Sequence, residues 1–214
     1  MERITLERVL PEIFASRGDI SSDIWLRDVS FERGKRYLVC AESGTGKSSL
    51  CSYIYGQRGD YRGAIRFDDE DVSRYDSVRW SAIRKGNISV LFQELRLFGE
   101  LTALENVWIK NSITNFKSKE EILALFEELG IADKLDSRTD RLSFGQQQRV
   151  ALIRALCQPF DFLLLDEPIS HLDDRNSDVM RDVILREVDK QGAGLIATSI
   201  GKHMNIDYDL CLNL

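Results

Sequence analysis

The chain has 214 residues, 43% hydrophobic and 30% charged, a size and balance typical of one globular unit with a sizeable core. Its formal net charge of −6 lacks the basic excess that nucleic-acid surfaces usually carry, so we expect no nucleic-acid partner. No stretch approaches the roughly 20 consecutive apolar residues of a membrane-spanning helix, and no charged-then-apolar leader opens the chain. These patterns predict a soluble protein that reaches a membrane only through a partner.

The apolar pattern predicts an α/β core. Residues up to about Phe31 favour a small antiparallel β element with irregular chain around it. A long amphipathic stretch over 174–191 predicts a helix. Continuous apolar runs predict buried strands at 37–41, 88–93, 161–168 and 194–199. Such strands alternating with helices are typical of a parallel sheet that is covered on both faces.

The strand pattern disappears between Leu101 and Leu142. Two segments there have helical spacing, and the second begins with acidic residues and stops at Gly130. We therefore expect one domain, residues 1–214, whose core (about 1–95 and 143–214) is divided by a helical subdomain (about 96–142).

A glycine-bearing segment, AESGTGKS (41–48), follows the first predicted strand and opens a predicted helix. It fits the P-loop pattern, with Ala41 where the first glycine usually stands. Glycines let backbone N–H groups converge on phosphate oxygens, and the positive end of the helix adds to the attraction. A chance lysine beside a turn is the alternative, which the strand–helix context disfavours. The expected nucleotide contacts are Ala41, Glu42, Ser43, Gly44, Thr45, Gly46, Lys47, Ser48 and Ser49.

A second motif, FLLLDE (162–167), is an apolar strand that ends in two carboxylates. Strand ends of an open α/β sheet meet at the edge where ligands bind. Asp166 is the expected partner of Mg²⁺ together with the Ser48 hydroxyl, and Glu167 is placed to polarise an attacking water. A solvated acidic turn is the alternative, and the P-loop makes it a poor one.

The run LSFGQQQRVALIRAL (142–156) resembles the signature of ATP-binding cassette (ABC) proteins, L-S-G-G-Q followed by Q-R-V-A-x-A-R-A-L. SHLD (170–173) is similar to the S-A-L-D loop of the family, and the ordered motifs cover nearly all of residues 25–200. The resemblance implies a P-loop NTPase fold with a parallel sheet core, an N-terminal antiparallel β element and an inserted α-helical subdomain. It also implies ATP and Mg²⁺ as ligands.

The resemblance implies a shared nucleotide site. ATP in the family lies between the P-loop of one cassette and the signature of another, so Ser143, the Gly145 amide and Gln146 would face a nucleotide of the opposite cassette. Gln93 matches the glutamine that reaches Mg²⁺ and the attacking water, beside the helical insertion where transmembrane permease partners dock. Asp173 matches a residue that contacts the opposite subunit.

The stretch LFQELRLFGELTALENV (91–107) looks most like the cassettes of lipoprotein-release, macrolide-export and cell-division complexes. Ordinary helix packing is the alternative reason for this aromatic and leucine-rich stretch.

The main departure from the family pattern is Ser199, which stands where the family has a switch histidine. That histidine contacts the γ-phosphate and orders the water, so a shorter neutral side chain is expected to slow hydrolysis by about 10²–10³-fold. His203 would replace it only if the loop bends back, and His171 is expected at the dimer seam. Phe144 in place of the first signature glycine leaves the Ser143 contact in place.

The aromatic residue that stacks on adenine in the family is not marked by a motif. Phe14 and Trp25 are the candidates, and Phe14 is favoured because Trp25 lies in an alternating segment that predicts a core strand.

Three functions fit these motifs. The first is an ATPase that dimerises on ATP and drives a transmembrane partner from the cytoplasmic face of the membrane. The second is a slow or inactive ATP-gated regulatory clamp, which Ser199 favours and Glu167 disfavours. The third is a soluble ABC protein of DNA repair or translation, which would need a coiled-coil insertion or a second cassette.

Overall fold

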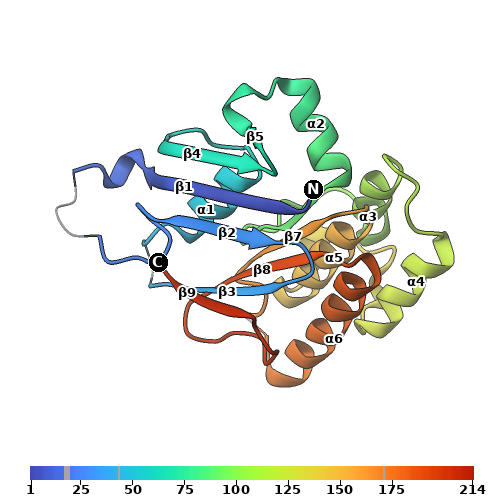
Figure 1. Ribbon diagram of the computed structural model, residues 1–214. Coiled ribbons are helices and arrows are strands. Elements are labelled where there is room, and N and C mark those ends of the chain that lie inside the picture. The colour runs from blue at the N-terminus through green and yellow to red at the C-terminus, as the bar shows by residue number, and fades with distance from the viewer. Residues whose placement is uncertain (17–19, 43, 171) are drawn as a thin grey trace.

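A computed structural model describes residues 1–16, 20–42, 44–170 and 172–214 (Figure 1). The expectations for Ser43 and His171 lie outside these residues. The described chain forms two β-sheets with one helix between them and a group of helices on the far face of the parallel sheet.

The smaller sheet is antiparallel, with strand order β2-β1-β4-β5. Its strands are β1 (Arg3–Pro11), β2 (Asp28–Glu32), β4 (Tyr61–Phe67) and β5 (Glu70–Asp71). The predicted N-terminal β element is therefore confirmed, although β4 and β5 extend it with chain that follows the P-loop. The strand expected over the alternating segment 23–31 forms only from Asp28 onward, because Leu26 has a left-handed φ of 61°. Trp25 lies before the strand and is buried, as expected.

The larger sheet is entirely parallel, with strand order β6-β7-β8-β3-β9. Its strands are β3 (Arg36–Cys40), β6 (Ile88–Leu91), β7 (Phe162–Asp166), β8 (Gly194–Ser199) and β9 (Leu210–Asn213). All four predicted strands are confirmed. The edge strand β9 was not predicted because it has only four residues and three of their side chains are exposed.

Side chains of the parallel strands alternate between two cores, as the two-residue period of a strand requires. Phe162 and Leu164 of β7 face a core that contains the antiparallel sheet and α1 (Lys47–Ile54). Leu163 and Leu165 face a second core with α5 (Phe144–Leu156) and α6 (Asp174–Gln191). Burial on both faces explains why these strands are continuously apolar.

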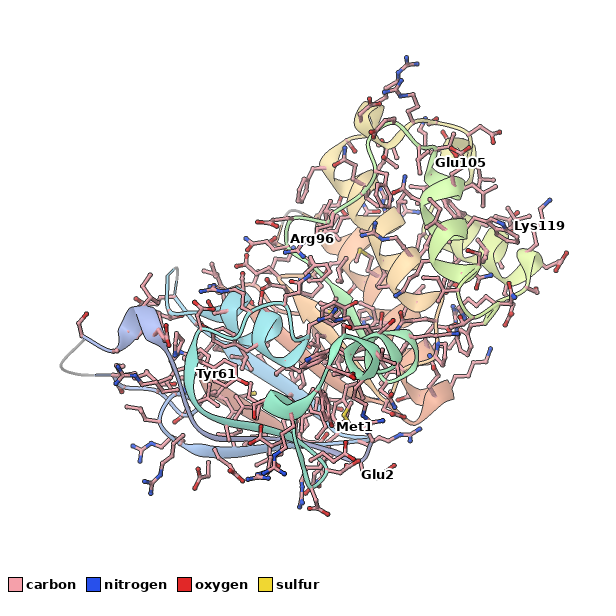
Figure 2. The ribbon with its side chains drawn as sticks, turned by 90° about the horizontal axis from the view of Figure 1, so that it is seen from above. Met1, Glu2, Tyr61, Arg96, Glu105 and Lys119 are labelled. Carbon is pink, nitrogen blue, oxygen red and sulfur yellow. The ribbon has the colours of Figure 1, made fainter. Side chains whose placement is uncertain are left out.

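Residues 96–142 hold helices and no named strand among the residues described. Two longer helices, α3 (Ala103–Asn111) and α4 (Lys119–Glu128), both begin with a capping box. In Figure 2, Glu105 and Lys119 lie at the outer part of this helical region, Met1 and Tyr61 lie in the part with the sheets, and Arg96 lies between. The subdomain bounds at 95/96 and 142/143 stay a prediction.

The remaining elements are short or weakly patterned. Helix α2 (Ser77–Gly86) was not predicted because Ile83 is its single buried residue and it has no apolar stripe. The 3-10 turns are η1 (Glu12–Phe14), η2 (Val72–Arg74), η3 (Ala132–Lys134) and η4 (Thr139–Arg141). Across the described chain, no helix combines the length and the apolar character needed to cross a membrane.

Candidate functional site

The carboxyl ends of the parallel strands gather the predicted site residues at one sheet edge. Cys40, the last residue of β3, is paired with Ser199 of β8, and Asp166 of β7 is paired with Thr198. The P-loop leaves β3 directly after Cys40, and Gln93 lies two residues past the end of β6. Parallel register therefore brings residues from four distant parts of the sequence to one place.

Two aromatic rings, Trp25 and Phe14, pack against the P-loop. Gly46 has φ 102°, and a Cβ there would lie 3.1 Å from Trp25 Cζ2 and 3.2 Å from Phe14 Cε2. The buried Trp25 indole also donates from Nε1 to the Thr45 carbonyl at 2.9 Å. Trp25 thus fixes the loop at the start of α1, a role that the sequence did not indicate. Gly46 is required for the left-handed turn and for this close packing.

Lys47 is a buried cation in the centre of the site. Its side chain is 6% exposed, and Nζ donates to the Glu42 carbonyl at 3.0 Å and lies 3.7 Å from Glu167 Oε1. A buried ammonium needs compensation by hydrogen bonds and negative charge. The backbone carbonyl and one carboxylate at 3.7 Å supply part of it, and a phosphate at the helix N-terminus would supply more.

The two carboxylates after β7 are held by Thr198. Its Oγ1 donates to Asp166 Oδ1 at 2.8 Å and accepts from the Glu167 backbone N–H at 3.3 Å. Glu167 has a left-handed φ of 53°, which is costly for a residue with a side chain. This strained turn returns the Glu167 carboxylate to the cavity that contains Lys47. Thr198 is a site residue that no motif in the sequence marked.

The donors expected for Mg²⁺ lie together. Ser48 Oγ donates to Gln93 Oε1 at 3.3 Å, and both residues line a cavity of about 230 Å³ with Asp166. Neutral and anionic oxygens are the ligands that Mg²⁺ prefers, and phosphate and water usually complete its shell. Burial, and secondarily the charge of Asp166, raises the pKa of the neighbouring Cys51 thiol, so that it stays protonated. No cluster of three or more His, Cys, Asp or Glu able to hold a metal occurs in the described residues.

The cavity that contains Lys47 has a volume of about 320 Å³ and is called the nucleotide cavity after the ligand expected there. Besides the residues already placed, Ile13, Phe14, Ser49, Arg58 and Ile200 line it. Phe14 is only 6% exposed, whereas Ile13 is 70% exposed. Phe14 therefore lies at the expected place but offers little free ring surface, and its stacking role stays a prediction. Ile13 and Arg58 were missed because neither belongs to a motif.

Ser199 is not one of the residues described as lining the nucleotide cavity. It is 4% exposed, and its hydroxyl donates to the Lys202 carbonyl and so closes its own loop. The next residue, Ile200, lines the cavity instead. His203 is exposed and its Nδ1 lies 3.0 Å from the Met204 carbonyl. The hydrogen bonds described for these two side chains go to backbone carbonyls of their own loop and not to Glu167 or Gln93.

The signature residues form the N-terminus of α5, apart from the P-loop cavity. Ser143 Oγ accepts from the Gln146 N–H at 3.4 Å, and Gln146 Oε1 accepts from the Ser143 N–H at 2.9 Å, which completes a capping box. A Cβ at Gly145 would lie 3.3 Å from Leu172 Cδ2. Ser143 is exposed and keeps its hydroxyl hydrogen for a further acceptor. None of the residues described as lining the Lys47 cavity comes from this segment.

Comparison with known proteins defines the class to which this fold and site belong. A family model described as ABC transporter matches residues 26–170, more than half of the chain. The chain belongs to this family of ABC transporter ATP-binding proteins, and the resemblance read from the signature is confirmed.

Individual relatives show which ABC transporter cassettes this chain resembles. An uncharacterized ABC transporter ATP-binding protein of Thermotoga maritima is 33% identical over 192 residues, covering 87% of this chain and 81% of that protein. The lipoprotein-releasing system ATP-binding protein LolD of Geobacter metallireducens is 34% identical, covering 79% of this chain and 76% of LolD. The macrolide export ATP-binding/permease protein MacB of a Shewanella species is 30% identical, covering 84% of this chain but 28% of MacB. The expected leaning to lipoprotein-release and macrolide-export cassettes is confirmed.

Solved structures share the fold. The dimeric structure of MJ0796, a bacterial ABC transporter cassette, has a TM-score of 0.77 at 24% identity and covers 92% of this chain and 87% of its own. A bacterial Atm1-family ABC exporter with ATP bound has a TM-score of 0.79 at 22% identity, covering 100% of this chain and 37% of its own. The P-loop NTPase fold predicted from the sequence is therefore confirmed.

Proposed function

We propose that this protein binds Mg²⁺ and ATP, hydrolyses ATP to ADP and phosphate, and uses the cycle of dimer closing and opening to drive a transmembrane partner. The observation that carries the proposal is the placement of the Glu167 carboxylate 3.7 Å from Lys47 Nζ in the P-loop cavity. A base and a phosphate-binding cation in one cavity are what phosphoryl transfer to water requires.

Each residue has a separate task in this proposal. Lys47 and the N-terminus of α1 bind the β- and γ-phosphates, while Ser48, Gln93 and Asp166 would hold Mg²⁺, which when bound neutralises phosphate charge. Glu167 accepts a proton from the attacking water while the water oxygen bonds to the γ-phosphorus. The bond between the γ-phosphorus and the leaving ADP oxygen breaks in the same step. Thr198 keeps both carboxylates in place through its hydroxyl.

A second cassette completes the site in this proposal. Ser143 and the N-terminus of α5 have the donors for a phosphate, yet they lie outside the Lys47 cavity of the same chain. Two cassettes in a head-to-tail arrangement would bring each signature to the other P-loop. The cassette MJ0796, which shares the fold and was solved as a dimer, supports a dimer of cassettes.

The surface for a permease subunit is proposed between the two parts of the molecule. A cavity of about 280 Å³ lies beside the loop of Gln93 and is lined by Phe92, Arg96, Phe98, Ile109 and Ile113 among others. Phe98, Ile109 and Ile113 are each about half exposed, at 53%, 45% and 50%. An exposed apolar patch of this kind is typical of an interaction site. Relatives named as parts of export and release systems support a permease partner at the cytoplasmic face of the membrane.

Phosphate release from ATP tests the enzymatic proposal. The parent protein should release phosphate with Mg²⁺ present, and Glu167→Gln should bind ATP while losing turnover by about 10²–10³-fold, since the base is gone. Lys47→Ala should bind ATP at least tenfold more weakly in calorimetry, because a charge-assisted phosphate contact is lost. Equal ATP affinity of parent and Lys47→Ala would remove the P-loop assignment. Equal turnover of parent and Glu167→Gln would remove the assigned base.

A regulatory clamp that binds ATP and turns it over slowly is the second candidate. The Ser199 hydroxyl supports it, because that group is engaged with the Lys202 carbonyl and does not line the nucleotide cavity. The same phosphate-release assay separates the two candidates, since a clamp would bind ATP tightly and release phosphate no faster in the parent than in Glu167→Gln.

A further inference from the structure

Arg58 lies at the nucleotide site although it is outside every motif. It belongs to the turn between α1 and β4, eleven positions after Lys47. The turn folds back along α1, so that Arg58 lines both the nucleotide cavity and the smaller cavity of Ser48 and Asp166. Arg58 and Lys47 are the two cations among the described residues that line the nucleotide cavity.

The guanidinium is held in a fixed orientation. Nε donates to Asp60 Oδ1 at 2.9 Å, and Nη2 donates to Asp60 Oδ2. Cζ lies 5.4 Å from the centroid of the Tyr53 ring, whose hydroxyl in turn donates to the Asp60 carbonyl at 3.0 Å. Asp60 is not among the residues lining the nucleotide cavity, whereas Arg58 is. The pair is therefore oriented with its cation toward the cavity.

The third contact of Arg58 reaches the phosphate-binding helix. Nη1 donates to Ser49 Oγ at 3.1 Å, and Ser49 lies in the first turn of α1 and lines the same cavity. Unpaired N–H groups of a first helical turn point at a bound anion. Nη1 carries a second hydrogen, so a phosphate oxygen that reaches Ser49 comes within reach of the guanidinium as well.

We propose that Arg58 is a second phosphate-binding cation of this site, acting with Ser49 on the phosphate chain of the bound nucleotide. The inference rests on the proposed nucleotide site and adds a residue to it. A planar guanidinium can donate to Ser49 and to a phosphate oxygen at once, because its hydrogens diverge in a fixed fork. Asp60 and Tyr53 hold that fork before the nucleotide arrives, which reduces the entropy lost on binding.

Arg58→Gln is the test, with Arg62→Gln as its matched control. Arg62 lies in β4, is exposed, and is absent from the described lining of the nucleotide cavity, so its loss removes the same charge from the same region. Calorimetry of purified full-length protein with Mg-ATP and Mg-ADP should give an affinity about fivefold to twentyfold lower for Arg58→Gln than for the parent. Arg62→Gln should change it less than about twofold, and Arg58→Lys should lie between.

Salt concentration and thermal unfolding separate phosphate binding from bracing of the turn. A lost charge contact in a partly exposed site is screened, so the affinity ratio of Arg58→Gln to parent should shrink toward one between 0.1 and about 0.5 M salt. A bracing role would lower the nucleotide-free Tm and leave a salt-independent ratio. The inference would be overturned if Arg58→Gln bound the nucleotide as tightly as the parent, or if Arg62→Gln lost as much affinity as Arg58→Gln. It would also be overturned if the loss of affinity in Arg58→Gln did not depend on salt. Failure of the parent itself to bind Mg-ATP would instead overturn the proposed function.

Discussion

Ser199 stands at the position where the family resemblance leads us to expect a histidine. Its hydroxyl closes the loop after β8 by donating to the Lys202 carbonyl, and Lys202 Nζ donates to the Leu172 carbonyl at 2.8 Å. The loop is therefore tied both to itself and to the chain before α6. Ile200, an apolar residue, takes the place beside the nucleotide cavity. Among the described residues, no histidine side chain lines the cavity that contains Glu167.

Ser199→His should raise kcat more than it changes KM. A histidine there would act on the developing charge of the γ-phosphate and on the water, so its contact is made mainly in the transition state. Steady-state phosphate release from parent and variant measures the effect, which we expect to be a rise in kcat of at least tenfold. Loss of the bond to Lys202 also loosens the loop, so the Tm of the variant should be recorded beside its turnover.

His203→Ala tests whether His203, rather than a residue at position 199, acts as the switch histidine. Its ring is exposed and contacts the Met204 carbonyl and the Tyr208 ring, 6.1 Å away between centroids. We expect turnover within twofold of the parent. If His203→Ala abolishes turnover while Ser199→His changes nothing, the loop rearranges on nucleotide binding and His203 is the switch.

At the scale of elements, three helices begin with the same motif, a capping box. Thr102, Ser118 and Ser143 each cap a helix through a reciprocal pair of hydrogen bonds with the third residue of that helix. The cap of α5 differs from the other two in its proposed second task at a nucleotide of the opposite cassette. Stability and phosphate binding can therefore be separated by comparing one cap with another.

Ser143→Ala and Ser118→Ala should lower stability alike and activity differently. Each loses an N-cap, which costs about 1 kcal/mol of unfolding free energy, measured by urea denaturation. Ser143→Ala should in addition reduce ATP turnover by about tenfold or more, because the hydroxyl that would contact the γ-phosphate is gone. Equal turnover in the two variants would argue that Ser143 serves the helix alone.

The sequence predicted those elements whose burial leaves a local pattern. β7 and β8 are buried at every position, and α6 begins and ends where its amphipathic stretch does. β4, β5 and α2 were missed because many of their residues are not buried. β4 is held by pairing with β1, β5 by pairing with β4, and α2 by packing of aromatic rings such as Trp80 on Phe67. Such support comes from residues distant in the sequence, which a local pattern does not contain.

The same reasoning explains which site residues could be found. Lys47, Asp166 and Glu167 belong to motifs in which chemistry fixes the spacing along the chain. Thr198, Trp25 and Arg58 act through contacts made across the fold, with Asp166, Thr45 and Ser49 respectively. Their neighbours in the sequence give no sign of these partners. Three-dimensional proximity, rather than residue type, marks them as part of the site.

At the scale of the whole molecule, the helical region is fastened to the core by a buried ion pair. Lys117 Nζ lies 2.7 Å from Glu187 Oε2 of α6, and both side chains are buried, at 2% and 6% exposure. The Asn111 side chain also bonds the backbone N–H and carbonyl of Lys117, each at 2.9 Å. Breaking a buried pair is costly, so the two parts should move little at this end. Motion on nucleotide binding is then expected near Gln93 and Arg96, at the other connection.

Closure of two cassettes on ATP is the last consequence of this architecture. In the proposed dimer, the Lys47 cavity of one chain and the α5 N-terminus of the other would together hold one nucleotide, so two copies would enclose two nucleotides. Glu167→Gln removes the base but keeps the shape of the site, and ATP should then accumulate in the closed state. Light scattering at saturating Mg-ATP should give the mass of two chains for Glu167→Gln, and of one chain for Lys47→Ala.

Ser143→Ala in the Glu167→Gln background should shift the dimer back toward monomer, because the proposed contact across the interface is lost, whereas Ser118→Ala should not. A Glu167→Gln protein that binds ATP yet stays monomeric would contradict closure of two identical chains and require a different cassette as partner.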